Sequence, residues 1–380
     1  MRRVKREPIY LDYNATTPLL PEVLDAMLPL LRDGFGNPSS GHARGRTARA
    51  AVERARQQVA ELVGRAADEI VFTGSGTEAS NLALAGLARA HREKRRIVTT
   101  SIEHPATLEP CRRLAQDGYE LVIVPVEPDG RVTTRAVLDA LTPDTLCVSV
   151  MHANNETGAL QPAAEIAALA RAQGILVHVD AAQSAGKVPI GELDADLLTL
   201  AGHKLYAPKG VGALVVRRGT TLAPQLLGGG QERGLRPGTE NVASIVGFGA
   251  ACALAARELP ARQARLRALA SGLLWRLRAE IPGLVLNGPE LERLPNTVNV
   301  SFPGLVGREL LDRSPELEAS TGSACHSDSE HPSAVLAAMG VSRERALGGV
   351  RLSVGVLTTE EQIERAAACL VSAARSLRSG

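Results

Sequence analysis

Short β-branched runs alternate with longer helical patterns along most of this chain, and this alternation limits what it can fold into. Strand-length apolar runs are predicted at 70–73, 97–101, 121–124, 146–151, 175–179, 197–200 and 211–216. Helical patterns are predicted at 21–31, 46–63, 77–94, 108–115, 163–172, 242–258 and 360–377. Such an order predicts an α/β protein with a mostly parallel sheet and helices on both faces.

The composition limits the class of protein further. Hydrophobic residues make up 44% of the 380 residues, enough for a large core, and a formal charge of +2 argues against nucleic acid as the main partner. We expect no membrane partner, because no apolar run is predicted to span a bilayer and none follows the basic start MRRVKR. The cysteines have neither disulfide nor zinc spacing: Cys111, Cys147, Cys252, Cys325 and Cys369. We therefore expect a cytoplasmic protein with no metal site.

Two of the predicted strands deliver charged residues at their ends. The run 175–179 ends at Asp180, and the run 197–200 is followed by Gly202-His203-Lys204. Open α/β sheets bind ligands at the carboxyl ends of their strands. Pyridoxal phosphate needs a lysine for its aldehyde and a carboxylate for its ring nitrogen, so this pair suits that cofactor. Alternatively, Asp180 is a cap and Lys204 an exposed lysine.

The segment Gly74-Ser75-Gly76-Thr77-Glu78 lies between a predicted strand and a predicted helix. Glycines there let backbone N–H groups approach a phosphate, and the start of the helix attracts its charge. The same letters fit a dinucleotide-binding fingerprint. A long preceding segment argues against that function, as does Glu103, beside a histidine, at the expected acidic position. A simple strand–helix turn is the structural alternative.

Further polar residues follow other predicted strands. His104, in SIEHP, can stack on an aromatic ring or move a proton, and an amide in NNETG (154–158) can donate to a ring oxygen. Both segments also suit purely structural roles. Cys325 lies in the small, polar segment 319–328, which suits a nucleophile that must move, and His326 favours its thiolate. Arg351 offers a fork for a carboxylate, or is an ordinary surface arginine.

A collinear series of segments resembles the cysteine desulfurases, close kin of the selenocysteine lyases. The segments are YLDYNATTP (10–18), FGNPSS (35–40), SIEHPA (101–106), ANNETG (153–158), HVDAAQ (178–183), GHK (202–204), GGGQERGLRPGTEN (228–241), RLPNTVNVSF (293–302) and GSAC (322–325). The resemblance implies the aspartate-aminotransferase-like fold type I of pyridoxal-phosphate enzymes. It also implies a homodimer with its active sites at the subunit interface. The expected division is a large cofactor-binding domain, 15–257, and a small α+β domain formed by 1–14 and 258–380.

The resemblance assigns a role to each candidate residue. Lys204 forms the Schiff base, Asp180 pairs with the ring nitrogen, and His104 stacks on the ring and moves protons. Arg351 and Asn155 bind the substrate, and Cys325 takes its sulfur. The other residues expected around the cofactor are Gly76, Thr77, Asn155, Gln183, His203 and, from the other subunit, Thr239. Many members have serine where this chain has Ala201, so one phosphate hydrogen bond is expected to be missing.

The implied reaction removes sulfur from L-cysteine, giving L-alanine and a persulfide on Cys325. The sulfur is expected to pass to an acceptor or scaffold protein that supplies iron–sulfur clusters, thio-cofactors or tRNA. A selenocysteine lyase is the main alternative, since the wording ACHSD around Cys325 resembles that group. An aminotransferase or racemase of this fold would leave the Cys325 segment idle. A scaffold without enzymatic activity would leave Lys204 and Asp180 unexplained.

Overall fold

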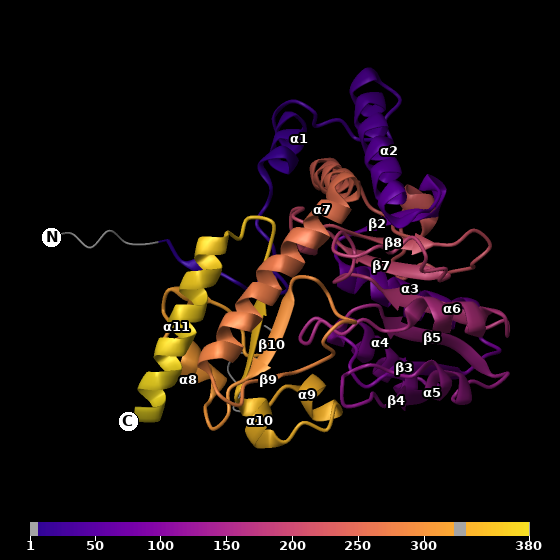
Figure 1. Cartoon of the computed structure of the whole chain (residues 1–380). Helices are drawn as coiled ribbons and strands as arrows, with labels where there is room; N and C mark the ends of the chain where they lie inside the picture. Colours follow the sequence, from indigo (N-terminus) through magenta and orange to yellow (C-terminus); the bar gives the residue numbers. More distant parts are fainter. Residues whose placement is uncertain (1–6, 323–331, 380) are drawn as a thin grey trace.

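The computed structural model describes residues 7–322 and 332–379 (Figure 1). Its main sheet has seven strands in the order β2-β8-β7-β6-β5-β3-β4. β8 runs antiparallel to both of its neighbours, and the remaining pairs are parallel, so the predicted mostly parallel sheet is confirmed. The strands are β2 (Ile70–Thr73), β3 (Arg96–Thr100), β4 (Glu120–Val124), β5 (Thr145–Met151), β6 (Leu176–Asp180), β7 (Leu197–Ala201) and β8 (Gly212–Val216).

Helices cover both faces of this sheet because alternate strand residues point to opposite sides. Val71 packs in a core with α3 (Gly76–Ala90) and α4 (Pro105–Gln116). Its neighbours Ile70 and Phe72 belong to the opposite core. That core is shared with α1 (Pro21–Arg32), α2 (Ala43–Val63), α5 (Thr134–Asp139), α6 (Ala163–Arg171) and the first part of α7 (Val242–Glu280).

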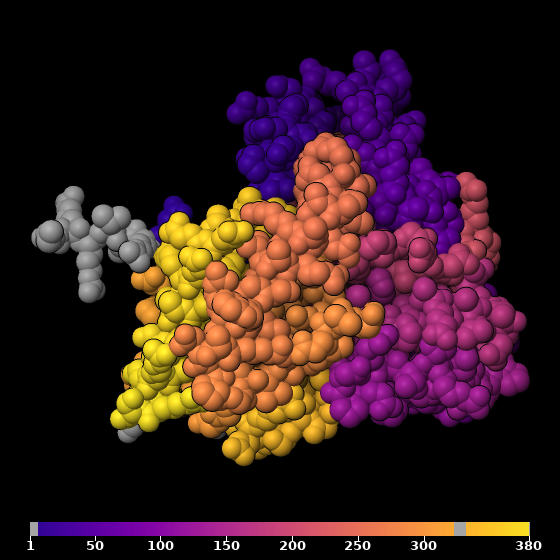
Figure 2. Space-filling model, in the orientation of Figure 1, coloured from indigo at the N-terminus to yellow at the C-terminus, as the bar shows by residue number. Residues whose placement is uncertain are grey.

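A second core lies outside the main sheet. Its strands are β9 (Val285–Leu286), β10 (Thr297–Ser301) and β12 (Gly349–Ser353), which form an antiparallel sheet, and the parallel pair β1 (Ile9–Tyr10) and β11 (Leu317–Glu318). The helices that pack in this core are α8 (Gly307–Asp312), α11 (Glu360–Ser379) and the last turns of α7. The short helices α9 (Ala334–Ala338) and α10 (Arg343–Leu347) instead form a small cluster with Ile102 and Met151. Figure 2 shows α7 and α11 side by side at the surface, where the two helices are in contact.

The helix predicted at 242–258 is longer than expected, and its predicted end at Glu258 is wrong. α7 continues through Pro260 to Glu280. A proline inside a helix costs about 3 kcal/mol, but the following turns bury an apolar stripe in the second core: Leu266, Leu269, Leu273 and Leu277. Burial of each leucine contributes about 1.5–3 kcal/mol, so the packing outweighs the proline. The predicted domain border falls inside α7, and the division into two domains stays a prediction.

The length and apolar composition of α7 would also allow it to span a membrane, which the sequence prediction did not anticipate. Half of its most apolar window is buried inside the protein, where α7 packs against α1, α2 and α11. A core helix of a folded domain has the same composition, so packing accounts for the apolar residues of α7. The absence of a membrane partner stays a prediction.

Candidate active site

The strands β2, β3, β5, β6 and β7 all end at the same edge of the main sheet. β2 and β7 share one direction because each is antiparallel to β8, and β7, β6, β5 and β3 are mutually parallel. The segments that leave this edge carry the residues predicted from the sequence: Gly76 and Thr77 after β2, His104 after β3, Asn155 after β5, Asp180 at the end of β6, and Lys204 after β7.

Lys204, Asp180 and His104 influence one another's ionisation, so they share one electrostatic environment. Burial raises the pKa of Asp180, although the backbone N–H of Ala182 donates a hydrogen bond of 2.9 Å to its Oδ1. The Lys204 Nζ donates to two backbone carbonyls, those of Asn14 at 2.6 Å and Ala15 at 2.7 Å. The amine and the carboxylate predicted from two separate strands therefore meet at one site.

His104 caps the start of α4. Its Nδ1 accepts a hydrogen bond of 3.1 Å from the backbone N–H of Ala106, so a neutral ring carries its proton on Nε2. Burial lowers the pKa of His104 and outweighs the opposing charge of Asp180, and the nearby Lys204 lowers the pKa further, which favours the neutral ring. A neutral, flat imidazole suits stacking on an aromatic cofactor and exchange of a single proton through Nε2.

The start of α3 lies against the end of β7. Ser75 caps the helix by accepting a hydrogen bond from the backbone N–H of Glu78 at 3.0 Å. A Cβ added to Gly76 would lie only 3.0 Å from the Cβ of Ala201, so glycine permits this close approach. Exposed Thr77 and the half-buried His104 line the same groove. The helix start is therefore available to an anion beside the Lys204 site.

The His203 ring lies next to the N-terminal segment. Its Nδ1 is 3.1 Å from the Thr16 hydroxyl, and its backbone carbonyl accepts a hydrogen bond of 2.9 Å from the Thr17 hydroxyl. Burial lowers the pKa of His203 to about 4, and the charge of Lys204 acts in the same direction. His203 is therefore neutral at physiological pH and can serve as a hydrogen-bond donor but not as a cation.

Asn14 connects several of the predicted residues and was missed in the sequence analysis. It is 1% exposed, and its backbone carbonyl accepts hydrogen bonds from both Lys204 Nζ and Gln183 Nε2. Its side-chain amide donates to the backbone carbonyl of Asn155 at 3.1 Å and to the hydroxyl of Thr297 at 2.8 Å. The only sign of Asn14 in the sequence was its place in the segment YLDYNATTP (10–18), which resembles the family. An asparagine by itself gives no indication of such a role.

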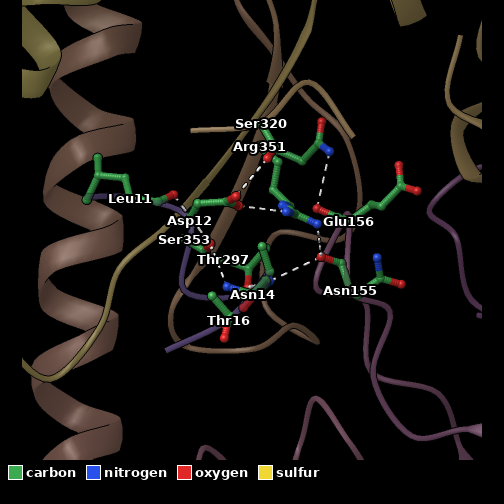
Figure 3. Close-up of polar contacts among 12 residues, drawn as sticks. Leu11, Asp12, Asn14, Thr16, Asn155, Glu156, Thr297, Ser320, Arg351 and Ser353 are labelled. Atoms are coloured by element: carbon green, nitrogen blue, oxygen red, sulfur yellow. Dashed lines mark hydrogen bonds and ion pairs between the residues drawn. The ribbon is translucent and has the colours of Figure 1, made fainter. Parts of the chain in front are cut away.

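Arg351 is 1% exposed and extends from β12 towards the same N-terminal segment (Figure 3). One guanidinium nitrogen pairs with Asp12 at 2.6 Å, and another donates to the backbone carbonyl of Asn155 at 3.2 Å. Its Nε is buried without a hydrogen-bond partner among the residues that the structure describes. Arg351 is therefore no ordinary surface arginine but a buried charge paired with Asp12, and its role in holding the substrate carboxylate stays a prediction.

Thr239 is exposed on the loop 228–240. The loop is anchored by a buried ion pair, in which Arg56 contacts both carboxylate oxygens of Glu232 at 2.7 and 2.8 Å. Glu232 and its neighbour Arg233 adopt positive φ angles of 47° and 59°, a strained backbone held by this pair. Whether Thr239 serves the other subunit stays a prediction, and Cys325 lies outside the described residues.

The residues present fit pyridoxal phosphate. A strand-end amine, a buried carboxylate and a flat neutral histidine stand beside a helix start that Gly76 lets pack closely against Ala201. The amine and the carboxylate match the chemical needs of the aldehyde and of the ring nitrogen, and the helix start matches those of the phosphate. The fold and this site together define a fold-type I pyridoxal-phosphate enzyme.

Comparisons with known proteins identify the family. The Aminotransferase class-V family matches residues 9–366, so the chain belongs to that family. A protein named cysteine desulfurase IscS, from Dictyoglomus turgidum, is 45% identical over 95% of this chain and 92% of its own length. A solved structure described as a NifS-like protein has a TM-score of 0.90 and is 36% identical, covering 98% of this chain and 100% of its own. A structure of SspA in complex with cysteine has a TM-score of 0.81 and 36% identity, covering 91% and 98%.

Glu103 is a buried acid that precedes His104 in the chain and interacts electrostatically with Asp180. Its Oε1 accepts hydrogen bonds from the hydroxyl of Thr100 at 2.7 Å and from the backbone N–H of Met151 at 2.9 Å. Its Oε2 has no partner among the described residues. Burial raises the pKa of Glu103 from 4.5 to about 8, so the folded protein favours the protonated acid.

The raised pKa of Glu103 predicts a pH-dependent loss of stability. The contribution of Glu103 to the free energy of unfolding is fully present below pH 4.5, the pKa of the acid in the unfolded chain. It is lost as the pH rises through about 8, because the acid must then ionise in a buried site. A Glu103→Gln variant keeps the Oε1 acceptor and cannot ionise. We expect its free energy of unfolding, relative to the parent protein, to rise between pH 4.5 and 8 in urea titrations. A constant difference across that range would contradict this account.

The Arg351 geometry predicts a selective loss of substrate use. An arginine–carboxylate hydrogen bond contributes about 1.5–3 kcal/mol, so Arg351→Ala should lower kcat/KM about 10- to 100-fold. Arg351→Lys should recover only part, because the fork is lost. Steady-state kinetics checks this, with Arg345→Ala as a control, since Arg345 bonds Asn287 and Leu286 in the same part of the fold. A kcat/KM within about twofold of the parent would exclude Arg351 as the residue that binds the substrate carboxylate.

Proposed function

We propose that this protein is a pyridoxal-phosphate-dependent cysteine desulfurase that stores the sulfur of L-cysteine as a persulfide on Cys325. The observation that carries the proposal is the meeting of Lys204, Asp180 and His104 at one sheet edge, close to the buried Arg351 clamp. The named relatives support cysteine desulfurase activity, and the SspA structure was solved with cysteine bound.

The residues of the site divide the work of the reaction. Arg351 holds the substrate carboxylate, and Asn155 and Gln183 orient the cofactor and the bound amino acid. When bound, pyridoxal phosphate stores the electron pair released at the substrate Cα. Asp180 keeps the ring nitrogen protonated, Lys204 takes the proton from Cα, and His104 can exchange a proton through Nε2. Gly76, Thr77 and His203 serve the phosphate.

Sulfur transfer follows from a thiolate at Cys325. The thiolate attacks the substrate sulfur, the Cβ–S bond breaks, and its electron pair returns to the carbon side, where a proton completes alanine. The sulfur gains a bond to Cys325 as a persulfide, so the oxidation of sulfur balances the reduction of carbon and no external oxidant is needed. Among the described residues, Cys111, Cys147 and Cys252 are buried, and burial raises the pKa of each thiol, which leaves them poor nucleophiles.

Several finer features belong to the same proposal. The active form is a homodimer in which Thr239, exposed on its anchored loop, completes the phosphate site of the other subunit. The persulfide sulfur passes to an acceptor or scaffold protein, and the name IscS of one relative favours the supply of iron–sulfur clusters. The protein works in the cytoplasm, where thiols stay reduced.

A Cys325→Ser variant tests this proposal and separates it from a selenocysteine lyase. Sulfide is a poor leaving group and needs the thiolate, whereas selenide departs more easily. We therefore expect the variant to lose alanine formation from cysteine, to keep substantial turnover of selenocysteine, and to retain the parent's cofactor absorbance. Cys369→Ser is the matched control, because that thiol is partly accessible and lies outside the site.

The location of the stored sulfur is the second part of this test. Parent protein given cysteine without reductant should gain one sulfur, and peptide mapping should find it on Cys325. Mapping to Cys111, Cys147, Cys252 or Cys369, or full cysteine turnover by the Cys325→Ser variant, would contradict sulfur transfer through Cys325. Formation of a keto acid in place of alanine would instead indicate an aminotransferase.

A further inference from the structure

Lys187 is a buried lysine that the proposed reaction does not use. It is 6% exposed, and its Nζ donates to the side-chain oxygen of Gln183 at 2.9 Å and to that of Asn14 at 3.2 Å. Among the described residues no carboxylate forms an ion pair with it. Burial lowers the pKa of Lys187 to about 7, and the charges of Lys204 and Arg351 act in the same direction. Burial of an amine without a carboxylate partner lowers the stability of the folded protein, so we expect Lys187 to have a role in the site.

The local backbone brings Lys187 back over Gln183, one turn earlier in the chain. The turn between them passes through Gly186, whose φ is +69°, a conformation that favours glycine. A Cβ at that position would also lie 2.3 Å from Leu205 Cδ2 and 3.1 Å from Ala255 Cβ, so any other residue would force Leu205 to move. The bond between the Lys187 amine and the Gln183 amide is thus built into the fold of the segment that follows Asp180.

Gln183 is held at both ends of its amide. Its oxygen accepts from Lys187, and its nitrogen donates to the Asn14 carbonyl at 2.9 Å. Lys204 Nζ donates to that same carbonyl at 2.6 Å, so the Gln183 nitrogen faces the reactive amine across one shared acceptor. An amide rotated by half a turn would set its oxygen against the Asn14 carbonyl and its nitrogen against a cation.

We propose that Lys187 is a positioning residue that fixes the Gln183 amide with its N–H donors towards the Lys204 site. When the cofactor competes with Asn14 for the Gln183 nitrogen, Lys187 is the remaining bond that determines the amide's orientation. The lysine acts through Gln183 and does not itself touch the cofactor. This assignment deepens the proposed function and rests on the cofactor binding that it assumes.

The test measures how fast the holoprotein loses pyridoxal phosphate after dilution into a scavenger of the free cofactor. Lys187→Met has nearly the length of lysine and lacks its donor. We expect the loss of cofactor to be about tenfold faster, which is the effect of one hydrogen bond to a charged group. Lys187→Arg keeps charge and donors, so its rate should lie closer to the parent's. Lys94→Met removes a half-buried lysine that bonds the Gly174 carbonyl, away from the site, and should leave the rate unchanged.

A double-mutant cycle with Gln183→Ala decides whether Lys187 acts through the amide. Once Gln183 is absent, Lys187→Met should accelerate cofactor loss by no more than about threefold. An effect of about tenfold in both backgrounds would overturn the assignment, since a lysine that acts by its charge alone does not need Gln183. Lys187→Leu also lacks a donor and supplies the same comparison if the methionine variant does not fold.

Two further measurements separate the possible failures. The free energy of unfolding of each cofactor-free variant reports any purely structural role of Lys187. A Lys187→Met variant that loses stability but releases the cofactor at the parent's rate would overturn the assignment. The release assay needs only bound cofactor and no sulfur transfer. A parent protein that binds no pyridoxal phosphate would overturn the proposed function together with this assignment, whereas additive effects in a parent that binds it would overturn the assignment alone.

Discussion

The hydrogen bonds centred on Asn14 are the interaction on which the rest of the site depends. Its carbonyl accepts hydrogen bonds from Lys204 and Gln183. Its side chain bonds Asn155, which follows β5, and Asn296 and Thr297 at the start of β10. One buried residue near the chain start therefore connects the edge of the main sheet to the elements around β10 and β12. Because an unmet buried polar group costs about 1–3 kcal/mol, these bonds hold the cofactor edge and the substrate clamp in one arrangement.

Charge balance follows from the same arrangement. Lys204 and Arg351 place positive charge at the site, and Lys187 adds part of a charge because burial lowers its pKa to about 7, while Asp180 and Asp12 supply negative charge. The excess suits the two anions expected there, a phosphate and a substrate carboxylate. Burial favours the neutral forms of His104 and His203. These histidines therefore add no fixed charge to the site and act as hydrogen-bonding or proton-exchanging groups.

The sequence predicted the sheet and the strand-end residues well, because strand ends and turn motifs are local patterns. It predicted the end of α7 at Glu258 wrongly, because the burial of Leu266 and Leu273 in the second core is a tertiary effect that overrides Pro260. It also missed Asn14, Asp12 and Lys187. Their roles depend on partners far away in the chain, such as Thr297 and Arg351, which no spacing reveals.

The central claim is that Lys204 is the residue that binds the cofactor aldehyde. Borohydride reduction of the holoprotein, followed by peptide mapping, tests it directly, because reduction fixes the cofactor on the amine that holds it. We predict that the pyridoxyl label is found on the half-buried Lys204 and that the buried Lys187 beside it carries none. Label on Lys187, or no label on any lysine, would contradict the account.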